Sequence, residues 1–195
     1  MRITDNRFQE ASQYAFEKIF PALVFPVQEI LTQEAVLTPG SFERKALLSA
    51  AAALIFTTLK TITKFHSFGT DLRDDVENFV SLYFPETYRW QYKKLYRTYE
   101  QGLLHYLGHA HNAEHAVIFT GKSGVAAFEQ ISGNILRVNV PEFFLDFQAA
   151  VKKFTEALNH DDGSVSRDSF FRNYEKIISA CAPLKTLSGA VGAGG

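Results

Sequence analysis

The longest uncharged run in the chain, ALLSAAAALIFTTL at residues 46–59, is the feature that most limits how the sequence can fold. Its fourteen residues fall short of the roughly twenty that a helix needs to cross a bilayer. Lys45 and Lys60 bracket a length that is typical of a core helix. Because the run is apolar on every side, we expect the central helix of a bundle, buried all round, and no membrane span.

Apolar residues recur at helical spacing along most of the remaining chain. They predict helices over residues 3–37, from Ser41 to about His66, in a short stretch before Pro85, from Glu86 to about Leu107, from about 139 to 158, and over 167–181. Pro21 and Pro26 should kink or split the first of these helices, because proline lacks the amide donor and clashes with the preceding turn.

Residues beside the turns support these boundaries. Ser41 is suited to cap the helix that follows it, with Glu43 in the first turn facing the positive end of the helix. Gly69 predicts the end of that helix, and Thr70 or Asp71 predicts the cap of the next one.

The spacing changes between residues 116 and 140. The segment AVIFTGKSGVAAFEQ holds two apolar runs around a Gly-rich turn, and ILRVNV alternates as a strand does. Both predict a small β-hairpin or pair of strands, with FTGKSG as the hairpin turn. FTGKSG is no phosphate-binding loop, because Ala116 stands where that pattern requires its first glycine and no clear helix follows.

We therefore expect a mainly α fold, a helical bundle of about five to seven helices with a small inserted β-hairpin. It would form a single helical domain over residues 1–187, followed by a flexible Gly-rich tail over 188–195. Hydrophobic residues make up 46% of the chain, including eighteen Phe, which suffices for a full core.

The net charge and the cysteine content limit the expected partners and the expected cellular compartment. The formal net charge of −1 provides no overall basic field for nucleic acid, although a local patch or a cleft built by a dimer stays open. The single Cys181 excludes an internal disulfide, and the first residues lack the apolar segment of a signal peptide. A reducing, cytoplasmic setting fits best.

Four of the six histidines lie within LLHYLGHAHNAEHAV at residues 103–117. His105 and His109 are four residues apart, and so are His111 and His115. Each pair would share one helical face, a spacing that can bind a transition metal such as zinc, nickel or iron through two imidazoles. On one straight helix the second pair would sit more than about 100° around from the first.

A four-histidine site therefore requires a break in the helix. Gly108 and Asn112 could permit that break, and Glu114 could add an oxygen ligand. The alternative is a polar helix end, where histidines face water or favour the negative terminus of the helix. No HExxH pattern is present.

The segment LYRTYEQGLLHYL, the short strands, and then LRVNVPEFFLDFQAAVKKFTEAL together resemble part of a HEPN-type helical domain, over about residues 42–158. Such domains have a long helix that ends in Arg-Asn-x-x-x-His, a variable insertion, and a long amphipathic helix. The resemblance implies one of two functions. Active members are dimeric, metal-independent ribonucleases whose Arg and His contact and protonate the scissile phosphate region. Others are inactive binding or scaffold modules beside toxin, CRISPR and nucleotidyltransferase systems.

The family motif matches this chain only in part. His105 matches the histidine, but Glu100 stands where the arginine should be and Gln101 where the asparagine usually is. A carboxylate at that place would repel a phosphate. Arg97 lies one helical turn earlier and could reach partway, but its spacing to His105 is too long. The resemblance therefore implies a non-catalytic member, with Arg97 and Gln101 as candidate binding residues.

Three hypotheses follow from the sequence. The first is a non-catalytic, HEPN-like accessory or interaction protein, a homodimer whose partner cleft lies on the exposed face of the helix over 86–107. The second is an enzyme, either a ribonuclease that uses His105 or a metal-dependent hydrolase that uses the histidine cluster. The third is a metal or small-ligand binder without turnover. The sequence names no substrate, partner or pathway.

Overall fold

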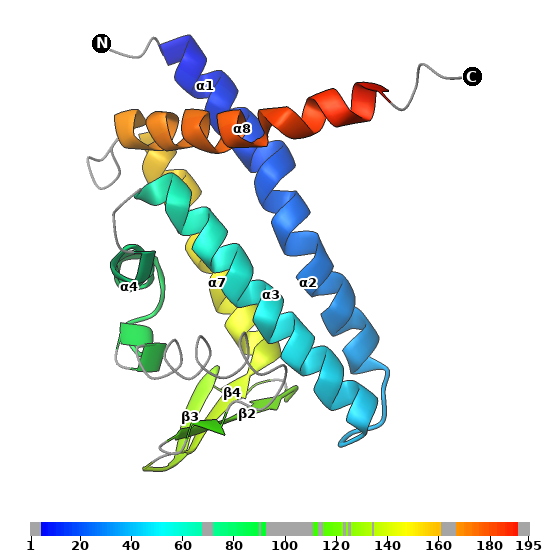
Figure 1. Ribbon diagram of the computed structural model, residues 1–195. Helices are drawn as coiled ribbons and strands as arrows, with labels where there is room; N and C mark the ends of the chain where they lie inside the picture. Colours follow the sequence, from blue (N-terminus) through cyan, green and yellow to red (C-terminus); the bar gives the residue numbers. More distant parts are fainter. Residues whose placement is uncertain are drawn as a thin grey trace.

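The computed structural model describes residues 5–67, 72–89, 91–92, 111–112, 115–122, 124, 126–133, 135–160 and 167–190. The fold is mainly α, with a small four-stranded sheet inserted between helices α4 and α7 in the chain. Helices α2, α3 and α7 run alongside one another, α8 crosses them near one end, and the sheet lies at the opposite end (Figure 1). The predicted fold class is confirmed.

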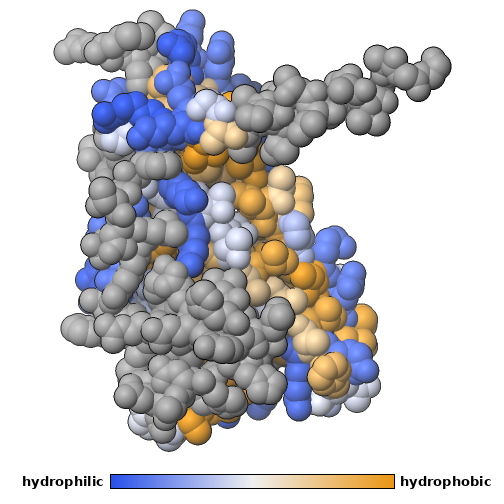
Figure 2. Space-filling model, in the orientation of Figure 1, coloured by the Kyte–Doolittle hydropathy of each residue, from blue (hydrophilic) through white to orange (hydrophobic). Residues whose placement is uncertain are grey.

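Helix α3 (Phe42–His66) lies in the middle of the helical layer and packs against α2, α4, α7 and α8. Ser41 caps it as predicted, because its Oγ accepts a hydrogen bond from the backbone amide of Arg44 at 3.2 Å. The prediction that α3 is buried all round is wrong, since Ala50 and Thr57, which lie two turns apart on one side of the helix, are exposed. Figure 2 shows apolar residues gathered along α2 and α3 on this face.

By length and composition alone, the 25 residues of α3 are enough to cross a membrane. Half of its most apolar window is buried inside the fold, which is what a core helix shows as well. The finding is weak evidence for a membrane span.

The N-terminal helical stretch is divided in the turn before Pro21, as expected, but not at Pro26. Helix α1 (Asp5–Tyr14) leads into one π-helical turn, η1 (Ala15–Ile19), and then into α2 (Phe20–Ala35). In the wide turn the amide of Phe20 bonds to the carbonyl of Ala15. The break therefore precedes Pro21, which lies in the first turn of α2, where a missing amide donor is tolerated. Pro26 lies inside α2.

The small sheet has the strand order β1-β2-β4-β3. Its strands are β1 (His111–Asn112), β2 (His115–Thr120), β3 (Phe128–Ser132) and β4 (Ile135–Asn139). Strands β3 and β4 form an antiparallel hairpin, whereas β2 and β4 are parallel. FTGKSG is therefore not a hairpin turn, because it connects β2 to β3 and these strands are not neighbours.

Burial explains why β4 takes the central place between β2 and β3. Leu136 and Val138 of β4 are both buried, whereas Glu129 and Gln130 of β3 are exposed and suit an edge strand. The chain therefore passes to the far edge of the sheet first and then returns to fill the centre.

Helix α7 (Val140–His160) follows β4 directly, with Asn139 before it and Pro141 in its first turn, as predicted. Its buried residues recur at helical spacing and include Phe143, Phe147, Ala150, Phe154 and Leu158. Helix α8 (Arg167–Ala190) is longer than predicted: it continues past residue 181 into the first residues of the expected tail.

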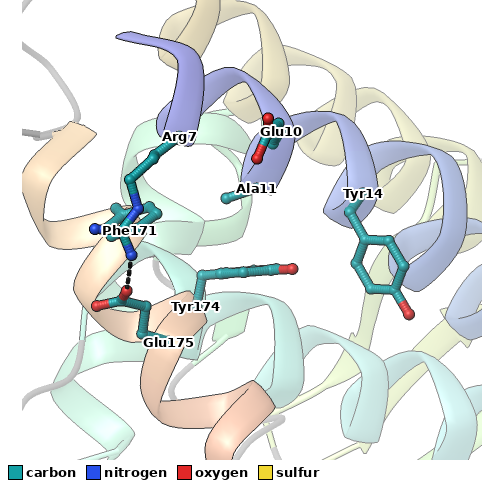
Figure 3. Close-up of a pocket in the computed structure, with 7 residues that line it drawn as sticks. All are labelled: Arg7, Glu10, Ala11, Tyr14, Phe171, Tyr174 and Glu175. Atoms are coloured by element: carbon teal, nitrogen blue, oxygen red, sulfur yellow. Dashed lines mark hydrogen bonds and ion pairs between the residues drawn. The ribbon is translucent and has the colours of Figure 1, made fainter. Parts of the chain in front are cut away.

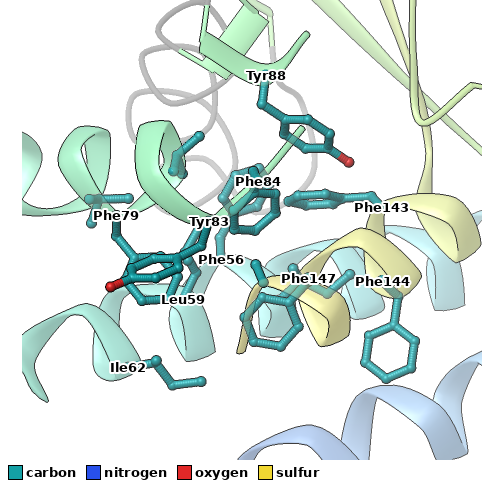
Figure 4. Close-up of a cluster of buried hydrophobic side chains, with 14 of the residues drawn as sticks. Phe56, Leu59, Ile62, Phe79, Tyr83, Phe84, Tyr88, Phe143, Phe144 and Phe147 are labelled. Carbon is teal, nitrogen blue, oxygen red and sulfur yellow. The ribbon is translucent and has the colours of Figure 1, made fainter. Parts of the chain in front are cut away.

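A buried cluster, mostly aromatic, joins α3, α4 (Leu72–Tyr83), the segment after α4 and α7 (Figure 4), and Tyr88 connects it to the sheet. The Tyr88 ring meets Phe128 edge to face, with centroids 4.6 Å apart, and stacks on Phe143 at 6.0 Å. The Tyr88 hydroxyl donates a hydrogen bond to Asp146 Oδ2 at 2.7 Å. Burial first, and then this carboxylate, raise the pKa of Tyr88, so the phenol stays protonated and remains a donor.

A buried ion pair ties the turn between α2 and α3 to the sheet. Arg44 Nε donates to Glu34 Oε1, and Arg44 Nη2 donates to the carbonyl of Gly121 at 3.2 Å. The Glu34 side chain is 3% exposed and the Arg44 side chain 18%. Because a buried charge needs a partner, this pair fixes both helix ends against the end of β2.

Candidate functional site

The residues singled out in the sequence lie mostly outside the described residues. This holds for Arg97, Gln101, His105 and His109. His111 lies in β1, and His115 lies in β2 opposite Asn112. This second pair is therefore not on one helical face, and the geometry expected from its four-residue spacing does not apply.

Metal binding by the four histidines stays a prediction. In the part of the chain that the structure describes, no group of three or more His, Cys, Asp or Glu residues is placed to hold a metal ion. Two of the four predicted ligands lie outside that part, so the structure does not test a site that they would complete.

A groove of about 350 Å³ runs between α1 and α8 (Figure 3). It is lined by Arg7, Glu10, Ala11 and Tyr14 from α1 and by Phe171, Tyr174 and Glu175 from α8. On each helix these residues are three or four apart, which places them along one side of the helix. The groove is therefore a meeting of two helical stripes from opposite ends of the chain.

Contacts behind the groove hold the two helices together. Phe8 of α1 meets Phe170 of α8 edge to face, with ring centroids 5.9 Å apart, and both rings are buried. The guanidinium of Arg167 lies 5.0 Å from the centroid of the Phe8 ring. The small side chain of Ala11 is itself buried and lines the groove.

One end of the groove is closed by Arg7. Its guanidinium lies 5.1 Å from the centroid of the Phe171 ring, and its Nη2 lies 3.0 Å from Glu175 Oε1. The Arg7 and Glu175 side chains are 54% and 51% exposed, so the ion pair itself contributes little to stability. The cation–π contact and the ion pair together hold a cation between a ring and a carboxylate.

The other end of the groove is aromatic and acidic. The rings of Tyr14 and Tyr174 meet edge to face, and the Tyr174 ring points into the groove below Glu10 (Figure 3). Within the described chain, the Glu10 carboxylate has neither a hydrogen bond nor an ion pair. Burial first, and then the neighbouring Tyr14, raise the pKa of Tyr174, so this ring stays neutral.

This arrangement suits binding. The lining carries one positive and two negative side chains, next to three aromatic rings. Aromatic rings and Arg are the residues most often found where protein partners bind tightly. The seven lining residues hold no Ser, Thr, Cys, Lys or His that could act as a nucleophile.

A second polar group lies at the end of α3, where Ser67 Oγ donates to Asp75 Oδ1 at 2.6 Å. The neighbouring His66 packs edge to face against Phe79, Tyr83 and Phe154. In the described part of the chain, His66 Nδ1 is buried and has no hydrogen-bond partner.

Burial lowers the pKa of His66, and Asp75 opposes this effect only in part. Because the Ser67 hydroxyl donates to the carboxylate and the imidazole lies among rings, no catalytic triad forms here. His66 is a neutral core histidine.

Comparisons with protein-family models, with curated proteins and with solved structures give no match to this chain.

The groove was not predicted from the sequence. The three- and four-residue spacings of Arg7, Glu10 and Tyr14, and of Phe171, Tyr174 and Glu175, were visible there. No short sequence pattern indicates that these two stripes, from opposite ends of the chain, face each other. The mixture of aromatic and charged residues on one helical side is the signal that could have identified each half.

Proposed function

We propose that this chain is a non-catalytic accessory or interaction protein of HEPN-like type, which binds a partner protein through the groove between α1 and α8. The observation that carries the proposal is the lining of this groove. It brings the partly exposed rings of Tyr14 and Tyr174 together with Arg7, which lies over the buried ring of Phe171. Tyr contributes a large contact area at small entropic cost, and Tyr and Arg are enriched among the residues that dominate the binding energy of protein interfaces.

The order of elements supports the HEPN-like part of the proposal. The strands form an insertion before the amphipathic α7, as in the family pattern, and most of the long helix expected over 86–107 lies outside the described residues. A homodimer, as in the active members of that family, belongs to the same proposal. The family motif around His105 lies outside the described residues, so the helical framework alone supports the relationship.

Selection from a displayed peptide library tests the proposal. The full chain is the bait, and the selected peptides are measured again against Tyr174→Ala, with Phe25→Ala as the control. Phe25 is a well exposed aromatic residue of α2 that does not line the groove. We expect peptides that lose affinity with Tyr174→Ala and keep it with Phe25→Ala. Selected peptides that bind both variants equally would contradict a binding role for the groove.

The non-catalytic part of the proposal has its own test. Untagged protein incubated with single-stranded RNA should leave the RNA intact, with or without added zinc. Cleavage that disappears in a His105→Ala variant would contradict the proposal and favour a ribonuclease. The variant is needed because trace nucleases that copurify with the protein cleave RNA regardless of position 105.

A further inference from the structure

We infer that the groove between α1 and α8 receives a cationic side chain, Lys or Arg, from a basic segment of the partner protein. This inference rests on the proposed function and names the chemistry of its partner. The basis is the contrast between the two ends of the groove, one of which already holds a cation.

The occupied end shows what the groove does with a guanidinium. Arg7 lies over the Phe171 ring at 5.1 Å and reaches Glu175 at 3.0 Å. A positive charge is attracted to the negative face of the ring and to the carboxylate at once. Ring and carboxylate both come from α8, which therefore presents a cation-binding pair of residues one helical turn apart.

The end of the groove beside Tyr14 repeats the same pair of chemical groups, an aromatic ring and a carboxylate. The Tyr174 ring extends into the groove toward Tyr14, and Glu10 lies above this ring in the view of Figure 3. Ala11 forms the floor, and its small side chain leaves room for a chain of methylene groups. In the described part of the chain, Glu10 has no cation of its own.

The charges of the lining residues favour a positively charged side chain in the groove. Glu10 and Glu175 carry two negative charges and Arg7 carries one positive charge, so the lining has a net charge of −1 (+1 − 2). An acidic partner would face the Glu10 carboxylate, which no cation in the described part of the chain compensates. A Lys or Arg side chain would compensate this charge, lay its methylene groups over Ala11 and place its head against the Tyr174 ring.

Two capped tripeptides that differ only in the charge of the central side chain test the inference. They are Gly-Arg-Gly and Gly-citrulline-Gly, since citrulline keeps the shape of arginine and lacks its charge. Each is titrated into the full chain, and the NMR signals of the Tyr14 and Tyr174 rings are followed. We expect saturable shifts of both rings with the arginine peptide and much weaker shifts with the citrulline peptide. Equal shifts with both peptides would overturn the recognition of charge.

Charge variants of the chain give a second, directional readout. Glu10→Gln removes the negative charge of this carboxylate and should weaken binding of the arginine peptide by roughly two- to fivefold. Arg7→Gln removes the competing cation, frees Glu175, and should tighten binding by a similar factor. Glu29→Gln removes an exposed carboxylate of α2 that does not line the groove, and it should change nothing. Damage to the fold would weaken binding in every variant, so changes of the same sign for Glu10→Gln and Arg7→Gln would overturn the inference.

The test separates failure of this inference from failure of the proposed function. If library-selected peptides depend on Tyr174 but contain no Lys or Arg, the interaction role stands and the cationic partner is wrong. If no selected peptide depends on Tyr174, both are wrong. Stronger binding of the free diamine putrescine than of the arginine peptide would also overturn the assignment to a protein side chain.

Discussion

The rings of Tyr14 and Tyr174 meet edge to face across the α1–α8 groove, with centroids 6.4 Å apart and planes at 78°. The two residues come from opposite ends of the chain, and each is partly exposed. The contact therefore does two things. It holds the first and last helices side by side, and it presents two aromatic faces to solvent in one hollow.

Because both tyrosines are partly exposed, groove variants should remain folded. Tyr14 is 46% exposed, so Tyr14→Ala loses only part of the burial of one ring. We expect Tyr14→Ala and Tyr174→Ala each to lower the free energy of unfolding by about 1 kcal/mol. Urea unfolding followed by circular dichroism measures this. A loss as large as that of a core Phe, about 3 kcal/mol or more, would show that these rings belong to the core.

The buried pair of Glu34 and Arg44 should be sensitive to removal of either partner alone. Arg44→Leu leaves the Glu34 carboxylate buried without its cation and should destabilise the fold by about 3–5 kcal/mol. The double variant Glu34→Leu/Arg44→Leu removes both charges and should recover much of that loss. A double-mutant cycle in urea measures the coupling. Losses that simply add would mean that the two side chains do not depend on each other.

Gly121 is required because of its closeness to Glu34. A methyl group at position 121 would collide with the Glu34 carboxylate, which Arg44 holds in place. We expect Gly121→Ala to cost about 1–3 kcal/mol of stability. Gly133→Ala is the matched control, because a methyl group there meets nothing within 4 Å. Similar unfolding midpoints for the two variants would contradict the close packing at the end of β2.

His66 should make stability depend on pH. Its pKa is lowered in the folded state from the ordinary value of 6.5, chiefly by burial. Below about pH 6.5 the unfolded chain binds a proton at this position more readily than the folded chain does. The free energy of unfolding should therefore fall with pH from there down through the folded-state pKa, by up to about 1.4 kcal/mol per pH unit.

Urea unfolding from neutral to mildly acidic pH, with His66→Phe as the comparison, checks this. Other histidines titrate in the same range, so the difference between the two proteins isolates position 66. The variant should show a shallower decline. Parallel curves would mean that His66 titrates alike in the folded and unfolded chain.

The Tyr88 hydroxyl can be tested separately from its ring. Tyr88→Phe keeps the contacts with Phe128 and Phe143 but removes the hydrogen bond to Asp146, and it should cost about 1 kcal/mol. Tyr88→Ala also leaves a cavity in the aromatic cluster and should cost about 3–5 kcal/mol. Thermal unfolding of the two variants measures the two losses of stability. Equal losses would mean that the packing of the ring does not contribute to stability.

Local signals in the sequence predicted the local features of the fold. The Ser41 cap, the end of α3 near His66 and the start of α7 after Asn139 depend on neighbours a few residues away. The strand order did not follow from the sequence, because it depends on which strand buries more apolar surface. The π-helical turn before Pro21 was also missed, since the proline pattern indicates a break but not its form.

The candidate site was beyond the reach of local reasoning for a similar reason. The ion pair of Arg7 and Glu175 joins positions 168 residues apart, and no short pattern encodes such a contact. The histidine stretch, by contrast, is a local pattern that the sequence displays directly. His111 and His115 then proved to lie on two paired strands, where helical spacing has no meaning.

The affinity of a library-selected peptide for the wild-type chain and for Tyr174→Ala is the most direct test of the interaction role. Isothermal titration calorimetry measures both, with Phe25→Ala as the control variant. We predict that Tyr174→Ala weakens binding roughly tenfold or more, because an aromatic ring that a partner covers carries much of the binding energy of an interface. Phe25→Ala should bind as the wild type does. Unchanged affinity in a folded Tyr174→Ala chain would contradict the account.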